Sequence, residues 1–447
     1  MAFKRVIPAV LLMLAFLPLG TSGCSASKNA PRPNFLIIIT DDQRYDTMEY
    51  MPKTQAGIFD EGVTFSKGYI TTPFCCPSRS SIFTGMYAHN HNVLQNNMPL
   101  NIETIAVALQ KNGYYTGLIG KYLNSWAGEA RPEYNYWVAF KSGETNYKDP
   151  VLNVNGTWNQ YPGYITYILS DYVIDFLGKA ASQPEPFMLI FAPNAPHTPT
   201  RPADEDLPLY DQLPAYSVPS VNEADVSDKP SSISKKPFLT ADELASADDN
   251  RRRQILTLVA LDRKIGEILA KLKETGQLDN TVIFFLSDNG LHWGEHRLDG
   301  KSSLYEESSH VPFAMRYPAL IPTPYVEQRL VANIDIAPTL YQLAGINIPY
   351  RVDGTSLLKL FEPNSKWRDH ILLEAWPPRG EWTAIHTDRY VYAETQNDLS
   401  EFYDLETDPY QLDNQINNPA YKDIIAEMKK QLEKDKKPKF FLSRLFK

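Results

Sequence analysis

The 447-residue sequence has few cysteines and no surplus of basic residues. Three cysteines, at positions 24, 75 and 76, cannot build a disulfide framework in a chain of this length. Lysine and arginine number 44 against 53 aspartate and glutamate residues, so a nucleic-acid partner is excluded. The net charge of −9 does not exclude an anionic substrate, because a small site can be locally positive. Hydrophobic residues at 43% and charged residues at 22% exclude wholesale disorder and indicate a globular protein.

Long apolar runs are also lacking, apart from one short run near the N-terminus. Lys4 and Arg5 precede apolar residues 6–19, and small residues 20–23 follow. This pattern predicts a secretory signal over residues 1–23 and not a membrane span. Thr-Ser-Gly-Cys24 resembles a bacterial lipobox, although Thr21 stands where Leu is usual, and the resemblance implies lipidation of Cys24. The alternative is a plain cleaved signal.

The expected location follows from this signal. We expect export to a bacterial periplasm or to the outer membrane and cell surface as a lipoprotein, or otherwise secretion. Membrane contact is expected only through a lipid on Cys24.

Four continuous apolar segments predict strands that are buried on both faces. They cover residues 34–40, 115–120, 186–192 and 281–287. Helical periodicity lies between them, at 102–111, 165–180 and 251–273. Strands that alternate with helices predict an α/β fold with a large, mainly parallel sheet sandwiched by helices.

The pattern changes toward the C-terminus. Residues 389–394 alternate like a half-exposed strand, residues 401–404 are expected to pair with them, and an amphipathic helix covers 422–434. These elements predict a smaller C-terminal α+β subdomain that carries an antiparallel sheet. Segment 202–237, rich in Pro, Ser and Asp, predicts a surface excursion. The division expected is a signal at 1–23, a linker at 24–33, a main catalytic domain at 34–370 and a subdomain at 371–447.

Oxygen-bearing side chains follow two of the predicted strands directly. Asp41 and Asp42 follow the first strand, and Asp288 and Asn289 follow the strand 281–287. Ligands of open α/β sheets bind at such strand ends, and hard divalent metals prefer oxygen ligands. For each pair alone, the alternative is an ordinary solvated turn.

A cysteine pair stands before a predicted helix, in Cys75-Cys76-Pro77-Ser78-Arg79. Pro77 is suited to the first position of a helix, so Cys75 would lie at an N-terminus whose N–H groups favour an anion. Arg79 could reach the same point from the next turn. The alternatives are two small buried residues or a vicinal disulfide.

Three further cations follow strands or metal-ligand candidates: Lys121, His197 and Lys301. Singly, such residues are usually solvated charges or satisfied polar groups. Together they would surround an oxyanion.

Cys75-x-Pro-Ser-Arg79 with Thr84-Gly85 resembles the signature of the type I sulfatases, in the alkaline-phosphatase-like superfamily. Other short pieces of that family appear in the same order over nearly the whole mature chain: 34–42, 120–121, 195–197, 287–290, 300–301 and 403–405. The resemblance implies hydrolysis of a sulfuric ester. It also implies that a formylglycine-generating enzyme oxidises Cys75 to Cα-formylglycine (3-oxoalanine). One hydroxyl of the hydrated aldehyde would attack sulfur, and the second would help to expel sulfate.

The resemblance also implies a metal and a set of roles. The implied ligands of one divalent cation, Ca²⁺ in preference to Mg²⁺, are Asp41, Asp42, Cys75, Asp288 and Asn289. Arg79 would orient the formylglycine, and Lys121 and Lys301 would neutralise sulfate oxygens. His197 would bind sulfate and protonate the leaving alcohol. Cys76 fills a variable position and carries no implied role.

One position departs from the family pattern. Many sulfatases have His two residues after the Lys that matches Lys121, and here that residue is Leu123. His89 or His91 could contribute instead; the alternative for both is a substrate-side or structural role.

Several phrases look closest to the N-acetylglucosamine-6-sulfatase and heparan 6-sulfatase branch, among them 75–81, 89–91, 120–124 and 331–339. This likeness suggests a 6-O-sulfated N-acetylglucosamine in a glycan as the substrate. Candidate sugar-facing residues are His91, His292, Tyr122, Trp126, Trp137 and Trp293, with core packing as the alternative for the aromatic ones. The competing functions are an arylsulfatase of broader specificity, a phosphonate or phosphodiester hydrolase of the same superfamily, and a non-catalytic glycan-binding lipoprotein.

Overall fold

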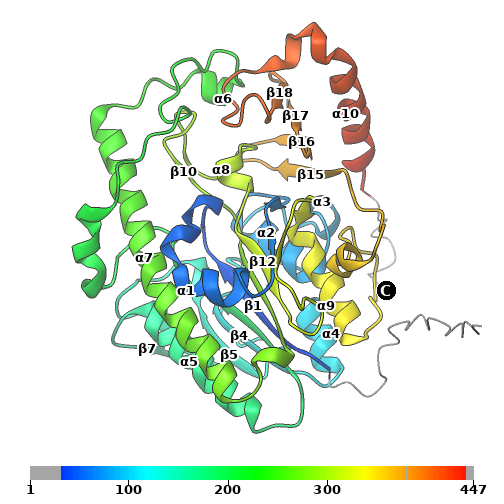
Figure 1. Ribbon diagram of the computed structural model, residues 1–447. Helices are drawn as coiled ribbons and strands as arrows, with labels where there is room; N and C mark the ends of the chain where they lie inside the picture. The colour runs from blue at the N-terminus through cyan, green and yellow to red at the C-terminus, as the bar shows by residue number, and fades with distance from the viewer. Residues whose placement is uncertain (1–31, 379, 439–447) are drawn as a thin grey trace, which may run out of the picture. The chain divides into compact units, whose positions relative to one another are not determined.

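A computed structural model describes residues 32–378 and 380–438 (Figure 1). The predicted signal, Cys24 and nearly all of the linker lie outside the described residues. Within the described ranges, no helix is both long and apolar enough to cross a membrane. The described residues from Pro33 onward form one compact unit, so a domain boundary at 370 stays a prediction.

A ten-stranded sheet forms the centre of this unit, in the order β13-β2-β12-β9-β1-β8-β4-β5-β6-β7. Its five central strands are mutually parallel, and the four predicted buried strands are among them, each correct to within a residue at either end. The central strands are β9 (Thr281–Ser287), β1 (Asn34–Thr40), β8 (Phe187–Ala192), β4 (Tyr115–Lys121) and β5 (Tyr136–Phe140). The outer strands are β13 (Tyr325–Glu327), β2 (Val63–Phe65), β12 (Phe313–Arg316), β6 (Val151–Val154) and β7 (Thr157–Gln160).

Two hydrophobic cores lie on opposite faces of the sheet, because successive side chains of a strand point to opposite sides. Phe35, Ile37 and Ile39 of β1 enter one core, and Leu36 and Ile38 enter the other. The first core is covered by α2 (Cys75–Thr84), α4 (Ile105–Lys111) and α9 (Ile336–Ala344), and the second by α5 (Ile165–Ala181) and α7 (Ala241–Glu274) (Figure 1). The predicted α/β sandwich is therefore confirmed.

Helix α7 begins at Ala241, well before the predicted start at residue 251. Its first turns carry few apolar residues, so the apolar stripe that predicts a helix starts late. Thr240 caps the helix in a reciprocal capping box with Glu243, which stabilises this polar beginning.

A separate antiparallel sheet follows toward the C-terminus, in the order β15-β16-β17-β18. The predicted pairing is confirmed: Tyr390 lies opposite Asp404. The elements are β15 (His370–Ala375), β16 (Trp382–Thr387), β17 (Tyr390–Thr395), β18 (Glu401–Asp404) and α10 (Lys422–Asp435). The remaining short elements are α1 (Pro52–Thr54), β3 (Gly68–Tyr69), α3 (Ala88–His91), α6 (Ser231–Ser234), β10 (His292–Trp293), β11 (Asp299–Gly300), α8 (Glu306–Ser309) and β14 (Val331–Ala332).

The predicted surface excursion 202–237 is partly buried. Ser220, Glu223 and Lys229 are all shielded from solvent. The Lys229 ammonium lies 3.2 Å from Glu223 and donates to the Gln411 carbonyl at 2.9 Å. Composition alone misled the prediction, because polar side chains can be buried when their hydrogen bonds and charges are paired.

Candidate active site

The metal-ligand candidates meet because β1 and β9 are adjacent and in register, with Thr40 opposite Ser287. The residues that follow both strands therefore emerge side by side. The Asp42 amide donates to Asp288 Oδ1 at 3.2 Å, and the Asn289 amide nitrogen donates to Asp42 Oδ1 at 2.5 Å. Sequence adjacency to two buried strands was thus enough to bring these four side chains together.

Two buried oxygens in this cluster lack a hydrogen-bond partner: Asp41 Oδ1 and Asn289 Oδ1. Buried polar atoms without a partner are uncommon, and an ion is one explanation for them. Ligand atoms of Asp41, Asp42, Cys75 and His197 all lie within 4.8 Å of one another. The carboxylate and amide oxygens are the donors that a hard divalent cation prefers, so the residues present fit such an ion.

Cys75 is the first residue of α2, so it does lie at a helix N-terminus. Pro77 is the third residue of α2 and not the first, which corrects the predicted helix start. Both Cys75 and Cys76 are free thiols, which excludes the vicinal disulfide. The Lys301 ammonium donates to Cys75 Sγ at 3.0 Å. Burial would raise the pKa of the Cys75 thiol, but Lys121 and Lys301 together hold it below its usual value.

Cys76 has the opposite environment although it is the next residue. Its Sγ accepts from the Asn124 backbone amide at 2.9 Å and lies 3.3 Å from the Asn124 side-chain oxygen. Burial raises the pKa of the Cys76 thiol to about 11. An inert, buried thiol therefore stands beside one surrounded by cations.

Arg79 and Lys121 bind the carboxylates from the α2 side. Arg79 Nε donates to Asp288 Oδ2 at 2.8 Å, and its Nη1 donates to the Lys121 carbonyl at 3.2 Å. Lys121 Nζ lies 2.7 Å from Asp41 Oδ2. Burial would raise the pKa of Asp41, but the surrounding cations, Lys121 foremost, hold it well below its usual range. The Arg79 Nη2 group has no hydrogen-bond partner, although Asp41 lies 3.9 Å away, so one donor is available to an anion.

His197 and Lys301 close the site from the other side. His197 Nε2 lies 3.7 Å from Asp42 Oδ2, and Lys301 forms an ion pair with Asp42. Burial would lower the pKa of His197, but Asp41 and Asp42 outweigh it and raise that pKa to about 9. Four cationic side chains and an unusual thiol thus share one buried site.

His91 and His292 are buried in hydrogen bonds of their own. His91 Nδ1 accepts from the Val93 amide at 3.1 Å, which directs Nε2 to the Ser81 hydroxyl, also at 3.1 Å. His292 Nε2 lies 2.6 Å from the Ser303 hydroxyl. Burial lowers the pKa of each imidazole to about 3, so both are neutral at physiological pH. A neutral, hydrogen-bonded imidazole fits a positioning role better than sulfate binding, and substrate contact by either residue stays a prediction.

The position at which many sulfatases have His is occupied by a core residue. Leu123 is buried in the hydrophobic core on the α2 side. His89 bonds through Nδ1 to Glu374 of β15 at 2.9 Å. The basic groups that contact the Cys75 thiol are instead Lys301 and His197.

The aromatic residues expected to face a sugar are core residues. Tyr122, Trp126, Trp137 and Trp293 are each no more than 6% exposed. Trp158 was not among the predicted sugar-facing residues, but it is 38% exposed on the β6–β7 hairpin. The dipeptide Asn155-Gly156 between two short segments of strand-forming residues is a hairpin signal that could have revealed it.

Comparisons with known proteins agree with this fold. A family model described as Sulfatase matches residues 33–346, and one described as N-sulphoglucosamine sulphohydrolase, C-terminal, matches 294–438. Human N-acetylglucosamine-6-sulfatase is 32% identical over 397 residues, which cover 82% of this chain and 71% of the human protein. The chain belongs to the sulfatase family, a family of sulfuric ester hydrolases.

One further relative and one solved structure show how much of the chain is similar to known proteins. A putative extracellular sulfatase Sulf-1 homolog of Caenorhabditis elegans is 34% identical over 390 residues, 80% of this chain. The match covers only 54% of that relative's length. A structure solved in complex with its substrate, D-glucosamine-2-N,6-O-disulfate, superposes with a TM-score of 0.80 over 90% of this chain and 97% of its own. At 24% identity, that likeness concerns the fold.

Proposed function

We propose that this chain releases inorganic sulfate from a sulfated glycan, with 6-O-sulfated N-acetylglucosamine as the substrate. The observation that carries the reaction class is the position of Cys75, at the N-terminus of α2 and in contact with Lys301. The human relative named N-acetylglucosamine-6-sulfatase supports the amino-sugar substrate. The structure solved with a 6-O-sulfated glucosamine has the same fold, which is compatible with that substrate.

The nucleophile in this proposal derives from Cys75 after conversion to formylglycine by a formylglycine-generating enzyme. The hydrated aldehyde supplies a hydroxyl nucleophile and a second hydroxyl for release of sulfate, which no ordinary side chain offers. Lys301 Nζ, now 3.0 Å from Sγ, is placed to donate to the oxygen that replaces the sulfur. Cys76 keeps its thiol, since Asn124 and the surrounding core hold it in an inert environment.

The metal in this proposal is a calcium ion held by oxygens of Asp41, Asp42, Asp288 and Asn289, next to residue 75. A bound divalent cation polarises a sulfate oxygen and stabilises negative charge as it develops. The unpartnered oxygens of Asp41 and Asn289 support this assignment. An all-oxygen set with several carboxylates favours Ca²⁺ over Mg²⁺, because Mg²⁺ retains more of its water.

The four cationic side chains of the site have separate roles in this proposal. Arg79, fixed by Asp288 and by the Lys121 carbonyl, orients residue 75. Lys121 and Lys301 neutralise the sulfate oxygens as charge shifts toward them. His197, whose Nε2 lies 3.7 Å from Asp42 Oδ2, would donate a proton to the oxygen of the leaving alcohol.

The location and the domain division are also proposed. An exported enzyme, with residues 1–23 as its signal and a lipid on Cys24, would meet extracellular glycans. The extracellular relative in Caenorhabditis elegans supports export. Residues 34–370 would carry the catalysis, and residues 371–447 would form the C-terminal subdomain, whose Glu374 on β15 bonds to His89 of the main domain.

A substrate panel tests the proposal directly. Inorganic sulfate release would be measured with 6-O-sulfated N-acetylglucosamine, N-sulfated glucosamine, 6-sulfated galactose and an aryl sulfate. A phosphate monoester, a phosphodiester and a phosphonate ester complete the panel. We expect the first substrate to have the highest kcat/KM. Faster turnover of the phosphodiester or phosphonate by orders of magnitude would overturn the sulfatase assignment, and a preference for the aryl sulfate would overturn the amino-sugar substrate.

A further inference from the structure

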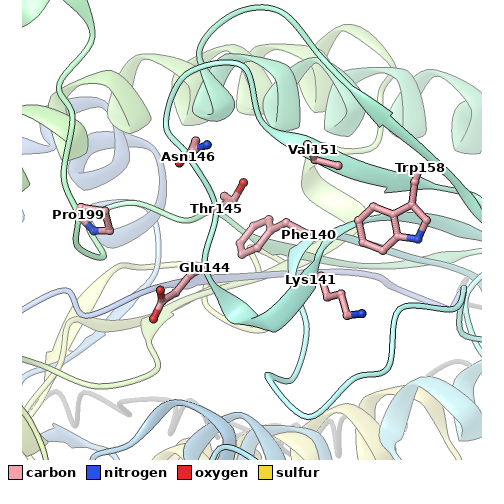
Figure 2. Close-up of a pocket in the computed structure, with 8 residues that line it drawn as sticks. All are labelled: Phe140, Lys141, Glu144, Thr145, Asn146, Val151, Trp158 and Pro199. Carbon is pink, nitrogen blue, oxygen red and sulfur yellow. The ribbon is translucent and has the colours of Figure 1, made fainter.

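A pocket of about 490 Å³ is lined by Lys141, Glu144, Trp158 and Pro199, among other residues (Figure 2). Figure 2 shows Trp158 and Lys141 together on one side of it and Glu144 on the side of Pro199. Its volume falls in the range of about 300–1,000 Å³ that is common for small-ligand sites. The mechanism above uses none of the side chains that line this pocket.

Residues that line the pocket are neighbours of two active-site residues. Lys121, at the end of β4, lies opposite Phe140 at the end of β5, and Lys141 follows directly. On the other side, the Tyr147 hydroxyl donates to the His197 carbonyl at 3.0 Å, and Pro199 lies two residues beyond His197. The pocket is therefore bounded by the neighbours of Lys121, which is assigned to sulfate, and of His197, which is assigned to the leaving alcohol.

Trp158 offers this pocket an aromatic surface. One part of the indole stacks on Trp126 with ring centroids 5.8 Å apart, and Trp126 in turn packs edge-on against Trp137 at 5.0 Å. This support fixes the ring, while 38% of the side chain stays exposed. Aromatic faces of this kind bind the apolar C–H face of a sugar ring.

Lys141 provides a positive charge beside that ring. A Cβ placed on Gly128 would lie 3.5 Å from Trp158 Cζ2 and 3.8 Å from Lys141 Cδ, so the two side chains flank the same point. Lys141 and Glu144 are both exposed to solvent. The pocket thus presents one exposed cation and one exposed carboxylate at opposite ends.

We propose that this pocket is a second sugar subsite, which binds the residue next to the sulfated amino sugar; this rests on the proposed function. Trp158 stacks on the pyranose ring, Lys141 pairs with a carboxylate on that sugar, and Glu144 accepts a hydrogen bond from a hydroxyl. The subsite gives the enzyme a preference for an anionic oligosaccharide over a single sulfated sugar.

The test compares two substrates that carry the same sulfated residue. The ratio of kcat/KM for a tetrasaccharide with uronate residues to kcat/KM for 6-O-sulfated N-acetylglucosamine would be measured. We expect Trp158→Ala to lower this ratio at least tenfold. Tyr325→Ala is the matched control, since Tyr325 is 39% exposed on β13 at the opposite edge of the sheet, and it should leave the ratio unchanged. An equal fall in the control, or no fall with Trp158→Ala, would overturn the subsite.

Separate variants test the proposed pairing of Lys141 with a carboxylate of the substrate. Lys141→Ala should lower the ratio severalfold and Lys141→Arg should restore most of it, whereas exposed Lys366→Ala should have no effect. With carboxyl-reduced tetrasaccharide, Lys141→Ala and the wild-type chain should give the same ratio. A loss that persists with the reduced substrate would contradict the pairing.

A binding measurement tests the sugar subsite independently of sulfate hydrolysis. Calorimetry with the desulfated tetrasaccharide measures binding at the subsite without turnover. Trp158→Ala should raise the Kd at least tenfold. If no sulfate ester is hydrolysed but this difference is seen, the proposed function fails and the sugar site stands. If esters are hydrolysed and both chains bind the tetrasaccharide equally, the subsite fails alone.

Discussion

The ammonium group of Lys301 lies 3.0 Å from Cys75 Sγ and forms an ion pair with Asp42. One side chain thus joins the residue proposed for modification to a proposed metal ligand, and Lys301 itself stands 226 positions after Cys75 in the sequence. Lys301 follows the short β11 strand, which pairs with β10 directly after the Asp288-Asn289 turn. The β10–β11 hairpin therefore brings Lys301 back to the site formed by Asp288 and Asn289, which precede the hairpin.

Replacing Lys301 by Met should lower kcat by about 10²–10³-fold, because a charged donor to the developing oxyanion is lost. Lys301→Arg should recover part of the rate. Steady-state kinetics with 6-O-sulfated N-acetylglucosamine would measure both. The control is Lys229→Met, which removes another buried ammonium that bonds to Gln411, away from Cys75. Lys229→Met should lower the melting temperature and leave most of kcat. A loss of kcat as large as that of Lys301→Met would contradict the specific role of Lys301.

Cys75→Ala should abolish turnover, whereas Cys76→Ala should retain most of it. The two thiols are adjacent, but cations surround only the first, and the second is held by Asn124. Peptide mass spectrometry of protein made with a formylglycine-generating enzyme should show an aldehyde in place of the Cys75 thiol. The aldehyde should also form in Cys76→Ala. Full activity with an unmodified Cys75 would exclude the proposed nucleophile.

Removal of the cation should destabilise the chain and stop turnover reversibly. Asp41, Asp42 and Asp288 are buried together, so their repulsion falls when Ca²⁺ is bound. At a Ca²⁺ concentration of 100 times Kd, binding adds about 2.7 kcal/mol to the free energy of unfolding. Thermal unfolding with chelator, then with Ca²⁺ or Mg²⁺, would measure this, and only Ca²⁺ should restore stability in full.

The chelation experiment should be repeated with Asn289→Leu. This substitution removes one proposed ligand oxygen and keeps a similar side-chain volume. It should lose most of the Ca²⁺-dependent shift in melting temperature. Asp279→Asn, at an exposed carboxylate before β9, should keep the shift. Exhaustive chelation that changes neither rate nor melting temperature would disprove the metal.

The sequence predicted the centre of the fold and the metal cluster because both depend on local signals. Buried parallel strands are continuous apolar runs, and the residues after β1 and β9 meet wherever those strands pair in register. It could not tell which aromatic residues face solvent. Tyr122 and Trp137 look the same in sequence as Trp158, but burial depends on which strand forms the edge of the sheet. The burial of Lys229 was hidden for the same reason, since its partner Gln411 is remote in sequence.

Gly120→Ala should prevent stable folding or displace Lys121. Gly120 has φ +114°, and a Cβ there would lie 1.9 Å from the Ala192 carbonyl oxygen in the neighbouring strand. Neither strand can shift without disturbing the central sheet. Gly276→Ala is the control, because Gly276 also has a positive φ of +69° but nothing lies within 4 Å of its added Cβ. Chemical denaturation should show a loss of about 1 kcal/mol for Gly276→Ala and a much larger one for Gly120→Ala. Equal losses would contradict the close approach of β4 and β8.

The attachment of α10 to the second sheet should weaken as pH rises above neutrality. His370, at the start of β15, lies 2.7 Å from Asp435 of α10 and 2.5 Å from Asp369. Burial would lower the pKa of His370, but its hydrogen bonds to Asp435 and Asp369 outweigh burial and raise it. A group whose pKa is raised by folding stabilises the fold fully below its unfolded value of about 6.5, and this contribution disappears as pH rises through the folded value. Hydrogen exchange of the α10 amides, corrected for the intrinsic rate, should therefore show lower protection at pH 8.5 than at pH 6. His370→Gln has no charge to lose, so its α10 protection should be low and nearly constant over this range. An unchanged pH dependence in His370→Gln would assign the effect to another group.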